Sequence, residues 1–144
     1  MLDKIYVVYW SQSGNTQAMA EAVGAGITAA GKEAAVVDVS SVSTAELKNA
    51  KAFALGCPAM GAEVLEEGEM EPFVTEVEGF AAGKTIGLFG SYGWGDGEWM
   101  RSWEERVKGD GANLVGGEGL IVNEAPDEAA LGQCSELGKN AAAL

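Results

Sequence analysis

Hydrophobic residues recur along the chain in two alternating patterns: short unbroken runs, and longer stretches with a helical period. The unbroken runs occupy positions 5–10, 35–39, 52–57, 85–89 and 119–122. A continuous apolar run of this length, without strict alternation, is typical of a parallel strand that is covered on both faces. The pattern therefore predicts five buried parallel strands.

Between these runs, apolar residues return every three or four positions, which predicts amphipathic helices. The four clearest sets are Met19, Val23 and Ile27; Met70, Phe73, Val74, Val77 and Phe80; Trp99, Trp103 and Val107; and Ala130, Cys134, Leu137 and Ala141. Ser43 with Glu46 three residues later has the spacing of a capping box, which predicts a further short helix. Because strands and helices alternate with short connections, we expect one domain over residues 1–144, a doubly wound five-stranded parallel α/β sheet with helices on both faces.

The composition argues against several classes of partner and of catalytic site. Nine Lys and Arg residues against 22 Asp and Glu residues give a net charge of −13, which disfavours nucleic acid and anionic membranes as partners. The chain has no histidine, which excludes histidine metal ligands and Ser-His-Asp or Cys-His nucleophiles.

The cysteine content and the lack of a long apolar run indicate in which cellular compartment the protein is expected. Cys57 and Cys134 are too few for a disulfide framework, and we interpret them as buried apolar residues. No apolar run approaches the roughly 20 residues of a membrane span, and the chain runs into a strand from its start without an export signal. We therefore expect a cytoplasmic protein.

Ligands of doubly wound sheets bind at the carboxyl ends of the strands. The segment 11–16, Ser-Gln-Ser-Gly-Asn-Thr, follows the first strand and leads into a helix. Hydroxyl groups and unpaired main-chain N–H groups at a helix N-terminus favour a phosphate, here without Lys or Arg. The same residues also suit a simple N-cap with a polar turn. By contrast, segment 79–85 is one residue short of a phosphate-binding Walker A loop and precedes a strand, so we expect a turn there.

Two further loops on this edge are unusual. Segment 58–63 follows the third strand, and segment 91–99 follows the fourth with Trp94 among several glycines. A tryptophan in such a loop suits stacking on a flat ring, and Met60 is a soft apolar residue that can cover the opposite face. The alternative is that Trp94 simply packs on Met60.

Taken together, the three segments resemble those of flavodoxins, and in particular the short-chain flavodoxins of anaerobic bacteria. The resemblance lies in Ser-x-Ser-Gly-Asn-Thr at 11–16, Met-Gly-x-Glu at 60–63 and Gly-Ser-Tyr-Gly-Trp-Gly at 90–95, in the same order along essentially the whole chain. It implies the strand order 2-1-3-4-5 and FMN as the cofactor.

The resemblance also implies the cofactor contacts. The phosphate would be held by Ser11, Gln12, Ser13, Gly14, Asn15 and Thr16. The flavin ring would lie between Met60 and Trp94, with Glu63 at its N3–H edge. Further contacts would come from Pro58, Ala59, Gly61, Ala62, Ser91, Tyr92, Gly93, Gly97 and Asn123. No metal ligand is expected.

In such flavodoxins the peptide after the methionine reorients on one-electron reduction, so that the carbonyl of Gly61 would accept a bond from flavin N5–H. Glycine suits the dihedral angles of such a turn. Relatives often carry Asp or another polar residue where this chain has Ala62, but we expect the reorientation to persist because it depends on main-chain atoms. The implied function is a low-potential one-electron carrier that cycles mainly between semiquinone and hydroquinone, without substrate turnover of its own.

Charged residues are placed unevenly. Segment 52–83 holds seven glutamates and no Lys or Arg, whereas Lys4, Lys32, Lys51 and Lys84 lie near the beginnings of strands. Negative charge at the ligand edge would attract basic partners and lower the potential of a flavin; the alternative is that the acidity only keeps the protein in solution. We expect a monomer whose partners are redox proteins with basic docking faces. The resemblance to flavodoxins implies iron–sulfur oxidoreductases, hydrogenases and flavoprotein reductases among them.

Two other functions remain open on sequence grounds. An FMN-dependent quinone or NAD(P)H oxidoreductase shares this architecture, but it needs a substrate pocket for which these short connections leave little room. A non-redox module that binds another phosphorylated ligand would use the phosphate loop alone.

Overall fold

The hydrophobic runs form the strands that their pattern predicts. The computed structural model describes residues 4–12, 14–60, 64–93 and 95–143. Its strands are β1 (Lys4–Tyr9), β2 (Glu33–Asp38), β3 (Ala52–Gly56), β4 (Thr85–Tyr92), β5 (Asn113–Leu114) and β6 (Leu120–Asn123). All strand pairs are parallel, as expected for strands buried on both faces.

The sheet has the order β2-β1-β3-β4-β5, and β6 also pairs with β4. β5 pairs with the beginning of β4 and β6 with its end, so the two short strands share the fifth position and the predicted order 2-1-3-4-5 is confirmed. Between them lies the short helix η2 (Val115–Gly117), in which Gly116 has a φ of 73°. The sequence pattern missed β5 because two residues, one of them Asn113, give no hydrophobic run.

Every predicted helix is present. The helices are α1 (Asn15–Ala29), α2 (Thr44–Lys48), α3 (Met70–Glu78), α4 (Glu98–Gly109) and α5 (Glu128–Ala142), and a short helix η1 (Val39–Ser41) precedes α2. Both bonds of the capping box predicted at α2 are formed, because Ser43 Oγ accepts from the N–H of Ala45 and Glu46 Oε2 accepts from the N–H of Ser43. Phe80, which the periodicity assigns to the third helix, lies beyond the end of α3.

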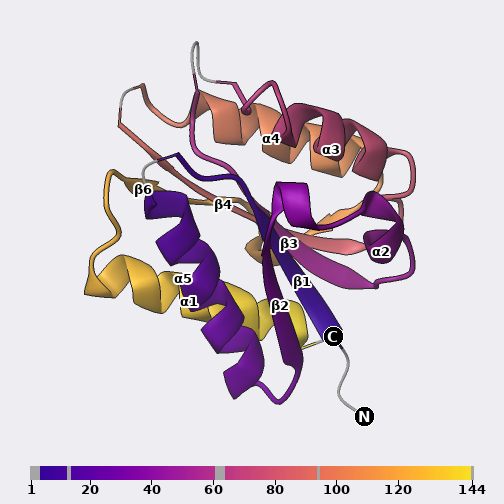
Figure 1. Ribbon diagram of the computed structural model, residues 1–144, viewed down its shortest axis with the longest axis horizontal. Helices are drawn as coiled ribbons and strands as arrows, with labels where there is room; N and C mark the ends of the chain where they lie inside the picture. Colours follow the sequence, from indigo (N-terminus) through magenta and orange to yellow (C-terminus); the bar gives the residue numbers. More distant parts are fainter. Residues whose placement is uncertain (1–3, 13, 61–63, 94, 144) are drawn as a thin grey trace.

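The helices cover the two faces of the sheet in separate layers. Helices α1 and α5 lie together on one face, and α3 and α4 lie on the other (Figure 1). Met19, Val23 and Ile27 of α1 are fully buried in the first layer, and Trp99 and Trp103 of α4 are almost fully buried in the second. Helices α1 and α5 approach closely: a Cβ on Gly138 would lie 2.0 Å from the carbonyl oxygen of Val23, so a side chain there would separate the two helices.

Segment 79–85 forms the turn that the sequence predicts, because β4 begins at Thr85. Its lysine has a structural role: Lys84 Nζ donates to the carbonyl oxygens of Lys48 at 2.8 Å and Ala50 at 2.6 Å. These bonds satisfy main-chain acceptors at the C-terminus of α2, where positive charge is favourable.

Candidate functional site

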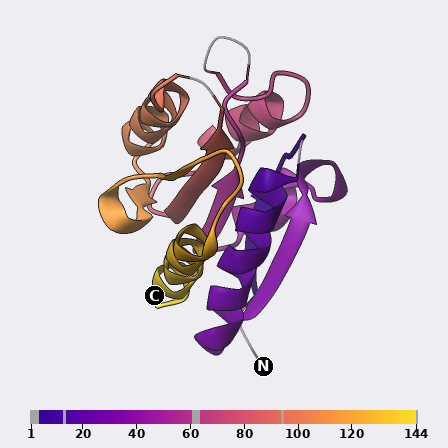
Figure 2. The same cartoon turned by 90° about the vertical axis from the view of Figure 1, so that its left-hand side faces the viewer.

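Four loops meet at the carboxyl edge of the sheet, the edge seen in Figure 2. The register brings the ends of the strands together, since Tyr9 pairs with Gly56, Gly56 with Phe89, and Tyr92 with Asn123. The loops enclose a cavity of about 220 Å³ that is lined by Gln12, Asn15, Pro58, Ala59, Met60, Ser91, Tyr92, Gly93 and Glu124. All but Glu124 are among the predicted cofactor contacts. The structure thus brings together residues from three segments that the sequence singles out.

The first loop presents free main-chain donors at the start of α1. Gly14 is the N-cap, with a φ of 95° that favours glycine, and no side chain caps the helix at this position. Ser11 Oγ accepts from the N–H groups of Gly14 at 3.1 Å and Gln17 at 3.3 Å. No described residue accepts a hydrogen bond from the N–H groups of Asn15 and Thr16. These groups are therefore available to an anion at the positive end of the helix.

The hydroxyl of Thr16 is directed toward the sheet. Thr16 is 1% exposed, Ser91 is 4% exposed, and their hydroxyl oxygens lie 3.3 Å apart. The pair links the first turn of α1 to β4 and satisfies two buried polar groups. Both residues were predicted to touch the cofactor. The structure pairs their hydroxyls, with Ser91 also in the cavity wall and the N–H of Thr16 available at the helix end.

The loop after β3 is held by main-chain bonds on both sides of its tip. The N–H of Ala59 donates to the carbonyl of Ser91 at 3.1 Å, and Met60 and Val64 exchange two hydrogen bonds of 2.9 Å each. Met60 and Val64 therefore form an isolated antiparallel bridge. The predicted contacts Gly61, Ala62 and Glu63 lie outside the described residues, as do Ser13 and Trp94.

Glu66 anchors the end of this loop, a role that no pattern in the sequence predicts. Its carboxylate accepts from the N–H groups of Gly68 at 2.7 Å, Glu69 at 2.7 Å and Met70 at 2.9 Å, and its own N–H donates to Cys57 Sγ at 3.4 Å. Partial burial acts to raise the pKa of Glu66, but the three N–H donors outweigh it and hold the pKa below the usual range.

Both cysteines behave as the buried apolar residues predicted from the sequence. They are free and fully buried. Burial raises the pKa of Cys57 to about 12 and that of Cys134 to about 11. Neither thiol is therefore poised as a nucleophile.

The loop after β4 leads into α4 through two left-handed glycines. Gly95 has a φ of 79° and Gly97, the N-cap of α4, a φ of 93°. Arg101 braces the turn by donating from Nη1 to the carbonyl of Asp96 and from Nη2 to its Oδ1, both at 3.0 Å. Gly97 was predicted as a cofactor contact, but it is buried against Ile121 and does not line the cavity.

Beyond β6, the residue that lines the cavity is the neighbour of the predicted one. Asn123 Nδ2 donates to the carbonyl of Tyr92 at 3.2 Å, and the side chain is not part of the cavity wall. Glu124 does line the cavity. Its position directly after the last strand was the available signal, but the charge pattern predicted this residue only as part of the acidic edge.

Comparisons with known proteins agree with this geometry. The family model described as Flavodoxin matches residues 7–138. A flavodoxin of Clostridium beijerinckii is 51% identical over 136 residues, covering 94% of this chain and 97% of that protein. A flavodoxin of Megasphaera elsdenii is 45% identical over 138 residues, covering 96% of this chain and 98% of that protein.

The chain belongs to the flavodoxin family. The solution structure of two-electron reduced Megasphaera elsdenii flavodoxin superposes with a TM-score of 0.88 at 44% identity, covering 97% of this chain and 99% of that one. The short-chain type inferred from the sequence is thereby confirmed. Flavodoxins are FMN proteins that transport electrons.

The described residues of this flavodoxin fit FMN. Main-chain N–H groups of Asn15 and Thr16 suit a phosphate, and the cavity beside them is walled by Met60 and Tyr92, which suit an apolar ring. The phosphate loop and the ring cavity are continuous, because Asn15 is part of the cavity wall. FMN would supply the redox chemistry, and the protein would bind and orient it.

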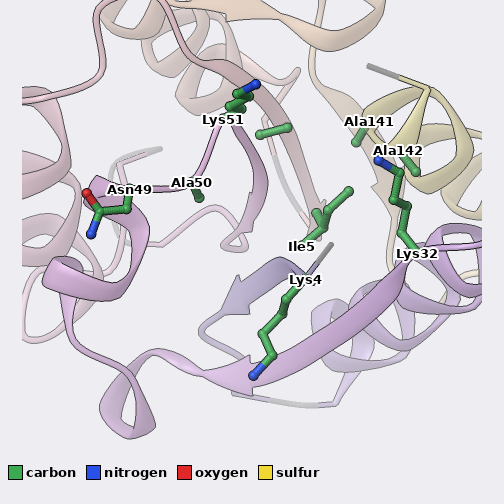
Figure 3. Close-up of a pocket in the computed structure, with 9 residues that line it drawn as sticks. Lys4, Ile5, Lys32, Asn49, Ala50, Lys51, Ala141 and Ala142 are labelled. Atoms are coloured by element: carbon green, nitrogen blue, oxygen red, sulfur yellow. The ribbon is translucent and has the colours of Figure 1, made fainter. Parts of the chain in front are cut away.

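Charge differs between the two edges of this flavodoxin. Lys4, Lys32 and Lys51 surround a cavity of about 270 Å³ at the amino edge of the sheet (Figure 3), where the sequence predicted lysines. The side chains of Lys4 and Lys51 point in opposite directions in this view, and Lys4 lies 3.7 Å from Glu33, so these lysines do not converge on one anion.

The acidic segment 52–83 is less uniform than its sequence suggests. Arg106 of α4 binds Glu71 through two bonds, at 2.8 Å and 2.9 Å, and Glu78 at 2.9 Å. Glu67 and Glu69 remain exposed near the ligand edge. Arg106 thus compensates part of the negative charge of this segment, and the described exposed glutamates lie both between β3 and α3 and, at Glu76, within α3.

Proposed function

We propose that this flavodoxin is a low-potential carrier of single electrons that binds FMN without a covalent bond. It would cycle mainly between the semiquinone and hydroquinone states and would have no substrate turnover of its own. The observation that carries the proposal is the continuity of two features: the unengaged N–H groups at the start of α1, and the ring-sized cavity that Asn15, Met60 and Tyr92 line. FMN needs these two features side by side, because its phosphate and its flavin ring belong to one molecule.

The phosphate would be bound by neutral groups alone. The N–H groups of Asn15 and Thr16 would donate to it, and the Ser11 hydroxyl, which already accepts two main-chain bonds, keeps its hydrogen for donation. Gln12 from the same loop lines the cavity. Ser13 is proposed as a further donor on the strength of the family resemblance.

The flavin ring would lie between Met60 and Trp94, with Glu63 at its N3–H edge. The carbonyl of Gly61 would accept the N5–H bond after the first electron, which stabilises the half-reduced state over the oxidised one. The paired bonds between Met60 and Val64 support this proposal, because they fix the main chain at the two residues that flank segment 61–63.

Acidic residues around the edge would make the second electron harder to add. One carboxylate at about 10 Å shifts a one-electron potential downward by roughly 20–70 mV, depending on the effective dielectric constant. Glu67, Glu69 and Glu124 are exposed near this edge. Their combined effect would keep the fully reduced protein strongly reducing.

The same charges would guide the partners. We propose that this flavodoxin acts as a monomer and docks its acidic edge on basic faces of iron–sulfur oxidoreductases, hydrogenases or flavoprotein reductases. We also propose a reducing, cytoplasmic setting, which the two free thiols support. Among the described residues, no helix is long and apolar enough to cross a membrane.

A stepwise reductive titration of the FMN-loaded protein, followed by absorbance, tests the proposal. We expect two separate one-electron steps with an intermediate radical spectrum, and the second step at much lower potential. A single two-electron step would contradict it. Rapid bleaching by NADH or NADPH alone would instead favour an oxidoreductase.

A further inference from the structure

A second, smaller cavity lies between the loop after β3 and helix α4, and we refer to it as the α4 cavity. Its volume is about 110 Å³, and its wall includes Val64, Glu71, Trp99, Ser102, Trp103 and Arg106. Trp99 connects it to the proposed FMN site, because its ring lies 5.6 Å from that of Tyr92, which lines the FMN cavity. Two contacting aromatic rings thus link the two cavities.

Trp103 brings an unsatisfied hydrogen-bond donor to the α4 cavity. The residue is 1% exposed, and its indole N–H has no hydrogen-bond partner. Among the residues the structure describes, it is the only buried side-chain nitrogen or oxygen in this situation. Trp99 shows the contrast, because its indole N–H donates to the carbonyl oxygen of Cys57 at 3.0 Å. An unpaired buried donor costs about 1–3 kcal/mol, so an acceptor that enters the α4 cavity would be stabilised.

The charged groups in the wall favour a neutral occupant. Arg106 Nη1 and Nη2 donate to the two carboxylate oxygens of Glu71 at 2.8 Å and 2.9 Å, so the two charges compensate each other. The hydroxyl of Ser102 also lies in the wall and forms no hydrogen bond with a described residue. A carboxamide matches these groups, because its oxygen accepts from an indole N–H and its NH₂ donates to a hydroxyl.

The size and the mouth of the α4 cavity favour a side chain of another protein over a free ligand. Its volume exceeds the roughly 30 Å³ share of a water molecule but is smaller than the roughly 150 Å³ cavity that holds benzene. Val64 in its wall is 41% exposed, more than any other large hydrophobic residue that the structure describes. A small ligand inside the cavity would leave Val64 in water, whereas a protein surface around an inserted side chain would cover it.

We propose that the α4 cavity is a docking pocket for a redox partner, which inserts a glutamine or asparagine carboxamide from a segment that also carries lysine or arginine. The cations are inferred from Glu67 and Glu69, which are exposed in the same loop as Val64. The indole nitrogen of Trp103 has less than 1 Å² of exposed surface, so a small rotation of the ring toward the cavity would complete the bond. The redox nature of the partner rests on the proposed function.

Three peptides with blocked ends test the pocket: Lys-Lys-Gln-Lys-Lys, and the same peptide with Leu or Glu at its centre. Leucine has a similar size but no acceptor, and glutamate adds a charge. Each peptide is titrated into isotope-labelled, FMN-loaded protein, and the indole N–H resonances are followed by NMR. We expect the Gln peptide to move the Trp103 resonance downfield, whereas the Trp99 resonance, already hydrogen-bonded, should stay in place.

The dissociation constants measure the size of the effect. Wild type should bind the Gln peptide about fivefold more tightly than the Leu peptide, as expected for one net hydrogen bond, and the Glu peptide most weakly. Trp103→Phe removes the N–H and keeps a ring, so it should bind the Gln and Leu peptides equally. Ser102→Leu fills the mouth and should weaken all three peptides, whereas Gln133→Leu, an exposed change on α5, should not.

The inference is overturned if wild type binds the Gln and Leu peptides equally, or if Trp103→Phe keeps the preference for the Gln peptide. It is also overturned if no peptide moves the Trp103 resonance, which would leave a bound water as the acceptor. Failure of the proposed function has a different signature. Reduction would then show a single two-electron step while the preference for the Gln peptide persists, and the pocket would stand without a redox partner.

Discussion

At the carboxyl edge of the sheet, main-chain donors and a carboxylate have no described partners, whereas at the amino edge two of the lysines are engaged by the fold. The N–H groups of Asn15 and Thr16 have no described acceptor, and the carboxylate of Glu124 has no described partner. At the opposite edge, Lys84 caps α2 and Lys4 pairs with Glu33. Both edges have a cavity of comparable size, so it is the free, converging polar groups that mark the functional one.

The largest expected effect comes from close packing beneath the site. A Cβ on Gly90 would lie 2.1 Å from the carbonyl oxygen of Cys57, so Gly90→Ala must move β3 or β4 where they support two loops of the cavity. We expect a loss of about 3 kcal/mol in the free energy of unfolding, measured by urea denaturation.

Gly83→Ala is the matched change at the amino edge. Gly83 has a φ of 82° and open space around it, so only backbone strain of about 1 kcal/mol is expected. Equal losses in the two variants would show that the carboxyl edge is not packed as described.

Thr16→Val breaks the hydroxyl pair that joins the phosphate loop to β4. The change leaves the buried Ser91 hydroxyl without its partner, which should cost about 2 kcal/mol and weaken FMN binding, because the start of α1 is no longer fixed to the sheet. Thr85→Val is the control, because it removes a hydroxyl at the beginning of β4 that makes no hydrogen bond to a described residue. If both variants bind FMN with wild-type affinity, as measured by quenching of flavin fluorescence, the pair has no role in positioning the loop.

Glu66→Gln tests the anchor of the loop after β3. Its carboxylate accepts three main-chain bonds, and we expect the variant to lose about 1.5 kcal/mol of stability at pH 7. Because the pKa of Glu66 is lower in the folded protein than its ordinary value of 4.5, this stability is fully present above pH 4.5 and is lost as the pH falls through the lowered value.

The wild type should therefore lose more stability on acidification below about pH 4.5 than Glu66→Gln does. Urea denaturation at several pH values measures the difference, with the exposed Glu67→Gln as the control. If the free energy of unfolding has the same pH dependence in wild type and in Glu66→Gln, the carboxylate of Glu66 does not anchor the loop.

The smallest expected effect is at the amino edge. Lys84→Met removes two bonds to carbonyls at the end of α2 and should cost about 1 kcal/mol, with no change in FMN affinity. A clear loss of FMN affinity would mean that the two edges are coupled, which the comparison above does not predict.

The sequence predicts strands and helices, which depend on local hydrophobic patterns. It does not predict hydrogen bonds between residues that are far apart in the chain. Unbroken apolar runs predicted the main strands and helical periods predicted every helix, whereas the strand order came from the family resemblance. β5 was too short to leave a pattern. Ser11 and Thr16 were correctly placed at the start of α1. The hydroxyl partner of Thr16 was not predictable, because it lies 75 residues away on β4.

The end of β6 shows the same limit of sequence-based prediction, here for the choice between two neighbouring residues. Sequence reasoning chose Asn123 for the site, but the sheet register turns its amide to the carbonyl of Tyr92, and Glu124 lines the cavity instead. Whether Asn123 or Glu124 faces the cavity depends on the register of β6 against β4 and on the positive φ of Glu124. A local sequence pattern predicts neither the register nor the positive φ.

The most direct test of the account is the affinity of the apoprotein for FMN compared with riboflavin, which lacks the phosphate. If the N–H groups at the start of α1 hold the phosphate, FMN should bind at least about 100-fold more tightly, about 2.7 kcal/mol, in line with bonds to a charged group. Equal dissociation constants would show that the carboxyl edge does not bind phosphate and would contradict the account.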